Sequence, residues 1–127
     1  DLYWYGVHGV EILYAAMGPG CKQVTRVSTP DTDVVVGVWA DGRIGTFRGT
    51  REGVHNYGAR IFGDKGNSTV EGHSYKGLVE QIVKFFQTKQ SPLDAQEIVE
   101  MYAFMQMADV SKEQGGKAVA LPEFSLE

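Results

Sequence analysis

Residues 33–50 read DVVVGVWADGRIGTFRGT, and this stretch decides the fold. Two runs rich in β-branched and aromatic residues, Asp33–Trp39 and Ile44–Arg51, flank the tetrapeptide at 40–43. Asp41-Gly42 at its centre supplies the positive φ values that a tight hairpin needs. The stretch therefore predicts two neighbouring antiparallel strands.

The same pattern of short apolar runs separated by turn residues extends on both sides of this hairpin. It predicts five strands in all. These strands cover Cys21–Thr29, Asp33–Trp39, Ile44–Arg51, Tyr57–Gly63 and Ser68–Glu71. A second tight turn is expected at residues 64–67, which read DKGN.

The second of these runs is apolar on both of its sides. Val34, Val36 and Val38 share one face of the predicted sheet, while Val35 and Trp39 share the other. Because neither set is polar, we expect both faces to be covered. The chain has helices for one face only, so the second face is expected to meet another domain or another subunit. Ordinary exposed apolar residues on a half-solvated sheet are the alternative.

Apolar residues at helical spacing predict two helices outside this region. The first covers about Gly6–Met17, and Gly18-Pro19-Gly20 ends it because proline cannot continue the hydrogen-bond ladder. The second is amphipathic and covers about Tyr75–Thr88. Its apolar stripe comprises Leu78, Val79, Ile82, Val83 and Phe86.

A third helix is expected to open at Ser91, with Pro92 in its first turn and Asp94 completing a capping box. Gly115-Gly116 is expected to end it, and residues 117–121 to return as a short edge strand. Its predicted buried stripe is Ile98, Met101, Tyr102 and Met105, with the methionines as gap-filling core. The signals together predict an α+β fold: an antiparallel or mixed sheet of about five or six strands with helices packed on one face.

Composition bounds the classes of function. The chain has 127 residues, 43% of them hydrophobic, which suits a single domain spanning residues 1–127. Its net charge of −4 disfavours a nucleic-acid partner. No apolar run of about eighteen residues predicts a membrane span, so we expect a soluble protein with no membrane partner and leave the compartment, cytoplasmic or exported, undecided. Because Asp1 is not an initiator methionine, we expect an excised piece of a longer protein.

The motifs disfavour two kinds of ligand site in this chain alone. It contains neither a G-x-G-x-x-G turn between a strand and a helix nor a G-x-x-x-x-G-K-[ST] phosphate loop, so we expect it to bind no dinucleotide by itself. The three histidines, His8, His55 and His73, show no metal-ligand spacing. Cys21 is the one cysteine, and we expect it to be a buried small side chain. No metal site is therefore expected.

His8 is the candidate for chemistry. It stands in the first turn of the first predicted helix, beside an aromatic cluster of Tyr3, Trp4 and Tyr5. An imidazole exchanges a proton near neutral pH, and aromatic rings stack on the apolar face of a sugar. A histidine that merely packs in the structure is the alternative, and spacing alone favours that alternative.

The other charged residues are expected at the surface. Glu97 and Glu100 lie near the polar side of the third predicted helix, where water solvates them. Four arginines are expected to form surface ion pairs with acidic residues such as Asp41, Glu52 and Asp64, and binding of an anionic partner is the alternative. These arginines are Arg43, Arg48, Arg51 and Arg60.

The order of several segments resembles the C-terminal domain of the Gfo/Idh/MocA oxidoreductases. The resemblance covers nearly the whole chain, and the ordered set is more specific than any one piece. Its pieces are Tyr5–Glu11, Met17–Gly20, Phe62–Gly66, Val83–Phe86, Ser91-Pro92, Ala108–Lys112 and Gly115-Gly116.

The resemblance implies the substrate and oligomerisation domain of an NAD- or NADP-dependent oxidoreductase, whose Rossmann domain is absent here. The implied substrate is a sugar, cyclitol or related polyol. His8 matches the histidine that exchanges the substrate proton, and Trp4 and Tyr5 would line the pocket. Many members of the family carry an acid four residues before the histidine, where this chain has Trp4.

Two further expectations follow from the resemblance. The family's catalytic lysine belongs to the absent Rossmann domain, so the chain alone is expected to be inert and to bind no coenzyme. We also expect a homo-oligomer formed through the sheet. A non-catalytic carbohydrate-binding or dimerisation module is the alternative, since Trp4 replaces the acid.

Overall fold

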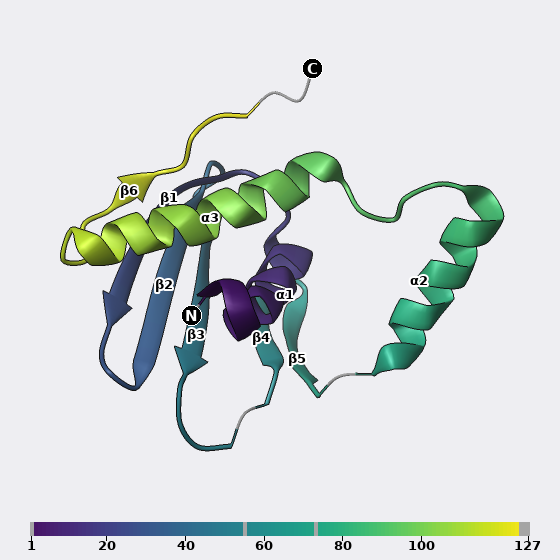
Figure 1. Ribbon diagram of the computed structural model, residues 1–127, viewed down its shortest axis with the longest axis horizontal. Coiled ribbons are helices and arrows are strands. Elements are labelled where there is room, and N and C mark those ends of the chain that lie inside the picture. Colours follow the sequence, from purple (N-terminus) through teal and green to yellow (C-terminus); the bar gives the residue numbers. More distant parts are fainter. Residues whose placement is uncertain (1, 55, 73, 125–127) are drawn as a thin grey trace.

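A computed structural model describes residues 2–54, 56–72 and 74–124 (Figure 1). A π-helical turn, Leu2–Gly6, leads directly into the first α-helix. The helices are α1 (Val7–Met17), α2 (Tyr75–Thr88) and α3 (Ala95–Glu113). The strands are β1 (Cys21–Ser28), β2 (Thr32–Trp39), β3 (Ile44–Thr50), β4 (Gly58–Gly63), β5 (Gly66–Glu71) and β6 (Val119–Ala120). None of the described helices is long and apolar enough to cross a bilayer.

The larger sheet has the strand order β3-β2-β1-β6, and all its pairs are antiparallel. The predicted hairpin is confirmed, because Val38 pairs with Ile44 and Gly42 takes a φ of 88°. The predicted return of the chain as an edge strand is also confirmed, since β6 pairs with β1. The α+β class predicted from the sequence is therefore confirmed.

A second, two-stranded sheet contains β4 and β5. Gly63 pairs with Gly66, so the chain reverses at Asp64-Lys65 within the predicted turn. The sequence led us to expect one sheet, and the described residues form two. A hairpin closes a short loop at small entropic cost, so β4 and β5 satisfy each other's hydrogen bonds without joining β3.

One face of the larger sheet carries the core. Val35 and Trp39 of β2 are buried there, beneath Tyr14 of α1 and Phe104 of α3. The centroid of the Tyr14 ring lies 5.7 Å from that of Trp39 and 5.8 Å from that of Phe104. Figure 1 shows α3 crossing the strands of this sheet. Three aromatic rings therefore join the two helices to the sheet.

Gly37 sets how closely α3 approaches β2. A Cβ atom at this position would lie 2.8 Å from Cε2 of Phe104 and 3.1 Å from the sulfur of Cys21. Both separations are shorter than an ordinary van der Waals contact, so a larger residue would displace the helix. The glycine within the run of valines thus belongs to the core face.

The start of α3 differs from the prediction. Asp94 is its N-cap and accepts a hydrogen bond from the Gln96 amide, whereas Ser91 accepts one from the Leu93 amide within the preceding turn. Pro92 therefore lies before the helix rather than in its first turn. A serine followed by proline and aspartate fits a local turn as well as a cap, which is why the pattern misplaced the boundary.

The buried stripe of α3 is also shifted from the predicted one. Met101 and Met105 are buried as gap-filling core, as predicted, but Tyr102 is 52% exposed. Ala103, Phe104, Ala108 and Ser111 complete the buried side, and this side packs mainly on β1. The predicted end is confirmed, because Gly115 and Gly116 both take positive φ and the Gly116 amide donates to the Ser111 carbonyl.

The amphipathic helix α2 has the predicted bounds but an unexpected environment. In Figure 1 it stands apart from the larger sheet, between two connecting segments. Six apolar side chains along it are between 38% and 64% exposed. They are Leu78, Val79, Ile82, Val83, Phe85 and Phe86. Of the described helices, α1 and α3 therefore pack on the face of the larger sheet, and α2 does not.

Candidate functional site

His8 lies on the exposed side of α1, one turn before Glu11. Its Nδ1 atom is 3.0 Å from Oε2 of Glu11. An ionised carboxylate can only accept a hydrogen bond, so Nδ1–H is the donor in this pair. The contact with Glu11 therefore occupies Nδ1. The other ring nitrogen, Nε2, is left for proton exchange with a ligand.

Tyr57, just before β4, stands against the same imidazole. The two ring centroids are 5.7 Å apart and the ring planes are nearly perpendicular, at 88°. The contact joins α1 to a residue 49 positions further along the chain, as the β4–β5 hairpin lies beside α1. His8 is thus bounded by Glu11 on its own helix and by Tyr57 from the hairpin. Sequence reasoning missed the role of both, because neither belongs to the aromatic cluster before the helix.

The glycine next to His8 has a structural role. A Cβ atom on Gly9 would lie 2.4 Å from the Phe47 ring of β3. The group that approaches this glycine is therefore the Phe47 ring. Gly9 thereby lets α1 lie directly on the sheet, while His8 and Glu11 face away from it.

The predicted aromatic cluster is divided between two environments. Tyr3 stacks on Tyr102 of α3, with the ring centroids 6.4 Å apart. Trp4 and Tyr5 point outward, are 75% and 68% exposed, and make an edge contact with each other at 6.3 Å. Within the described residues, neither of these two rings contacts His8. Their apolar surface is open to a ligand on the same end of α1.

Glu100 corrects a prediction, since its carboxylate is not simply solvated. Its oxygens accept hydrogen bonds from the Tyr14 hydroxyl at 3.1 Å and from the amides of Gly20 and Cys21 at 2.8 Å each. Desolvation by burial, followed by the Glu100 charge, raises the pKa of Cys21 to about 12. The same two causes raise the pKa of Tyr14. Glu100 thus stabilises the Gly18-Pro19-Gly20 connection, and Cys21 is buried, as predicted.

A buried ion network is the second feature that the sequence did not reveal. Arg26 of β1 is 3% exposed, and its Nε donates to Asp33 at 2.9 Å while its Nη1 donates to Asp109 of α3. Arg51 also pairs with Asp33. Burial acts to raise the pKa of Asp33, but hydrogen bonds from Arg26 and Ser28 and the two guanidinium charges outweigh it and lower that pKa.

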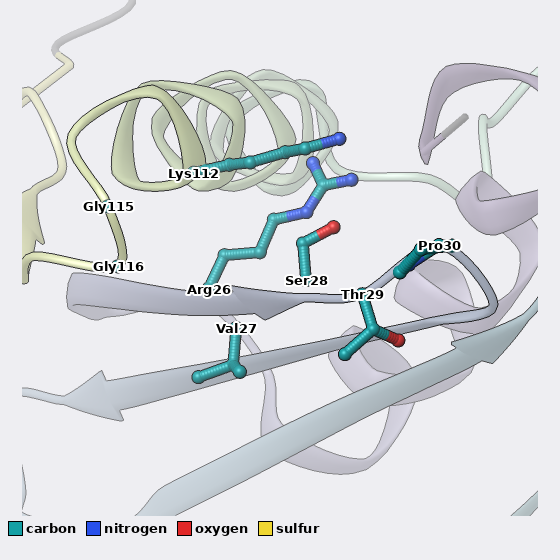
Figure 2. A pocket seen from close by; sticks show the side chains of 8 residues that line it. All are labelled: Arg26, Val27, Ser28, Thr29, Pro30, Lys112, Gly115 and Gly116. Carbon is teal, nitrogen blue, oxygen red and sulfur yellow. The ribbon is translucent and has the colours of Figure 1, made fainter.

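An open groove of about 630 Å³ lies beside this network, between the end of β1 and the end of α3 (Figure 2). The side chains of Arg26, Ser28 and Lys112 extend into it, whereas those of Val27 and Thr29 point to the other side of the strand. The charge of Arg26 is already compensated by two aspartates, and the negative end of the α3 dipole faces the groove. These features disfavour an anion site.

The surface arginines follow the prediction in part. Arg43 pairs with Asp41 at 2.7 Å. Arg51 pairs with buried Asp33 instead of a surface carboxylate, and Arg60 lies over the ring of Phe62 at 5.2 Å. Among the described residues no three histidine, cysteine or acidic side chains gather to hold a metal ion. His55 and His73 lie outside the described residues.

Comparison of the chain with protein-family models, with curated proteins and with solved structures found no match. The resemblance of its segments to the Gfo/Idh/MocA C-terminal domain therefore remains a prediction from the quoted motifs.

Proposed function

We propose that this chain is the substrate and assembly domain of an NAD(P)-dependent oxidoreductase that acts on a sugar, cyclitol or related polyol. The observation that carries the proposal is the exposed pair of His8 and Glu11 on a helix anchored to the core, with Tyr57 against the imidazole. In this proposal His8 accepts the proton of a substrate hydroxyl, and Trp4 and Tyr5 contact the apolar side of the substrate.

The chemistry of His8 follows from the geometry of the pair. With Nδ1–H donated to Glu11, the lone pair of Nε2 accepts the proton as the substrate O–H bond breaks. The imidazolium that forms lies beside the Glu11 carboxylate, which stabilises its charge. A ligand hydroxyl must come within about 3 Å of Nε2, a distance that the exposed position of His8 permits.

In this proposal the coenzyme is held outside this chain. Pyrophosphate binding needs a strand, a glycine-rich turn and a helix in that order. In the described residues α1 precedes β1, and the glycine-rich turn between them leaves a helix and enters a strand. A nicotinamide coenzyme, which would take the hydride from the substrate carbon, is therefore held elsewhere in the proposed enzyme, and we expect this chain alone to be inert.

The assembly part of the proposal rests on uncovered apolar surface. The second face of the larger sheet carries exposed Val27 and Ile44 and the half-buried Val34, Val36 and Val38. The apolar side of α2 is a further surface of this kind. Contiguous apolar surface of this extent is typical of contact with another domain or subunit. We propose that the sheet face forms a homo-oligomer and that the absent Rossmann domain is a further partner.

A non-catalytic carbohydrate-binding or dimerisation module is the second candidate. The exposed rings of Trp4 and Tyr5 favour it, because sugar-binding surfaces use such rings without any acid or base. The two candidates differ in whether His8 is needed for turnover. In the module, His8 contributes no chemistry and the polyol is bound unchanged.

The deciding experiment is an assay of NAD(P) reduction by the full-length gene product with a panel of polyols. We expect activity with at least one polyol and a loss of at least about a hundredfold in kcat for His8→Ala, as is usual for removal of a general base. Tyr102→Phe, which keeps the ring on α3, is the matched control. Equal activity of the wild type and His8→Ala would make His8 structural. Polyol binding without any turnover would favour the module.

A further inference from the structure

We infer that Glu11 is the positioning residue of His8, supplying the acceptor that Trp4 cannot supply from four residues before it. The inference deepens the proposed function and rests on it for its catalytic meaning. The structural part of the inference concerns the tautomer of His8. It depends only on the 3.0 Å contact between Nδ1 of His8 and Oε2 of Glu11.

The pair is mounted on a rigid element. Val10 and Tyr14 of α1 are fully buried, and Gly9 places the helix against Phe47. Residues three apart on a helix are neighbours on one side of it, so His8 and Glu11 meet without any rearrangement of the backbone. A carboxylate held in this way orients the ring throughout its contact with a ligand.

The consequence is a choice of tautomer. A solvated neutral imidazole prefers to carry its proton on Nε2, which would present a donor to the substrate instead of an acceptor. A hydrogen bond from Nδ1–H to Glu11 reverses this preference and leaves the Nε2 lone pair outward. The Tyr57 ring stands nearly perpendicular to the imidazole and restricts its rotation out of this arrangement.

Trp4 does not fill the same role. Its indole has a single N–H donor and no acceptor, so it cannot take a proton donated from Nδ1. Its ring makes an edge contact with Tyr5. Glu11 is the carboxylate within reach of the imidazole in the described residues.

The tautomer is measured directly by long-range ¹H–¹⁵N correlation spectra of the ¹⁵N-labelled chain at about pH 8.5, where an ordinary imidazole is neutral. A His8→Gln variant identifies the His8 signals. We expect the wild type to carry the proton on Nδ1, and Glu11→Ala to shift the ratio of tautomers about fivefold towards Nε2–H, as for the loss of one hydrogen bond. Glu11→Asp should restore part of the shift.

Glu113→Ala removes an exposed glutamate from the end of α3 and is the matched control. It should leave the His8 spectrum unchanged. A wild-type His8 with its proton on Nε2, or a ratio that Glu11→Ala does not change, would overturn the inference. Backbone amide spectra of each variant report whether the fold is retained.

A polyol titration on the same samples separates this inference from the proposed function. A chain that binds polyols but shows no effect of Glu11 on the tautomer keeps the function and loses the inference. A tautomer that responds to Glu11, together with a full-length protein that neither binds nor oxidises polyols, confirms the positioning contact and refutes the proposed function.

Discussion

At the scale of single residues, two carboxylates have structural roles that the neighbouring sequence does not predict. Glu100 binds the connection after α1, and Asp33 joins Arg26 of β1 to Arg51, which directly follows β3. Each is held by donors that are themselves partly or fully buried. Removing either acceptor leaves those donors without a partner, and that loss costs more than the hydrogen bond itself contributes.

Glu100→Leu is expected to lower the free energy of unfolding by about 2 kcal/mol, because the amides of Gly20 and Cys21 and the Tyr14 hydroxyl lose their acceptor. Urea denaturation followed by tryptophan fluorescence measures the change. Glu97→Leu, one turn earlier on α3, should change stability by less than about 0.5 kcal/mol. Equal effects of the two substitutions would contradict the role given to Glu100.

The lowered pKa of Asp33 predicts a dependence of stability on pH. A carboxyl whose pKa is lower in the folded chain than the ordinary value of about 3.9 contributes its stability above that value and loses it as the pH falls through the folded pKa. The urea midpoint should therefore decrease steeply below about pH 4. Asp33→Asn should already be less stable at pH 7 and should show a shallower decrease. A variant with the wild-type slope would show that other carboxyls cause it.

At the scale of elements, local patterns located the helices well and misjudged one boundary and one environment. The turn at Ser91-Pro92 and the cap at Asp94 use the same residue types, and only the hydrogen bonds distinguish them. For α2 the amphipathic helix was predicted correctly, but an apolar stripe does not determine which surface it packs against. The residues of α2 have no buried side chain in the described structure.

The boundary of α3 can be tested by removing each candidate cap. Asp94→Ala should lower the free energy of unfolding by about 1 kcal/mol, because the amide of Gln96 loses its acceptor at the helix N-terminus. Ser91→Ala should cost less than about half of that, since it removes only a local turn contact. Thermal unfolding by circular dichroism compares them. A larger effect of Ser91→Ala would place the start of the helix at Ser91 after all.

At the scale of the whole molecule, the helices cover one face of the larger sheet and leave two apolar surfaces open, the far sheet face and α2. Burial of one face is enough to build the core, as Tyr14, Trp39 and Phe104 show. It leaves Val27 and Ile44 in contact with water, which is unfavourable in a free monomer. The predicted oligomer would remove these apolar side chains from water.

Sedimentation velocity at tens of micromolar should therefore show a species larger than the monomer. Ile44→Lys on the open sheet face should weaken the association at least about tenfold, because an unpaired charge would be buried at the contact. Gln106→Lys, at an exposed position of α3 on the opposite side of the sheet, is the matched control. Ile82→Lys on α2 reports whether that surface takes part as well. A clean monomer of the wild type would contradict the contact through the sheet.

The alternation of valines, the Asp41-Gly42 turn and the helical stripes determined the class of fold, most element bounds and the placement of His8 on the first helix. These signals act between residues that are close in sequence, where period and backbone preference decide the outcome. Only the tertiary structure decided that Glu100 binds the amide of Gly20, that Arg26 reaches Asp109, and that Tyr57 stands against His8. Such pairs lie 49 to 83 positions apart, and their meeting depends on how the helices lie on the sheet, which no local pattern encodes.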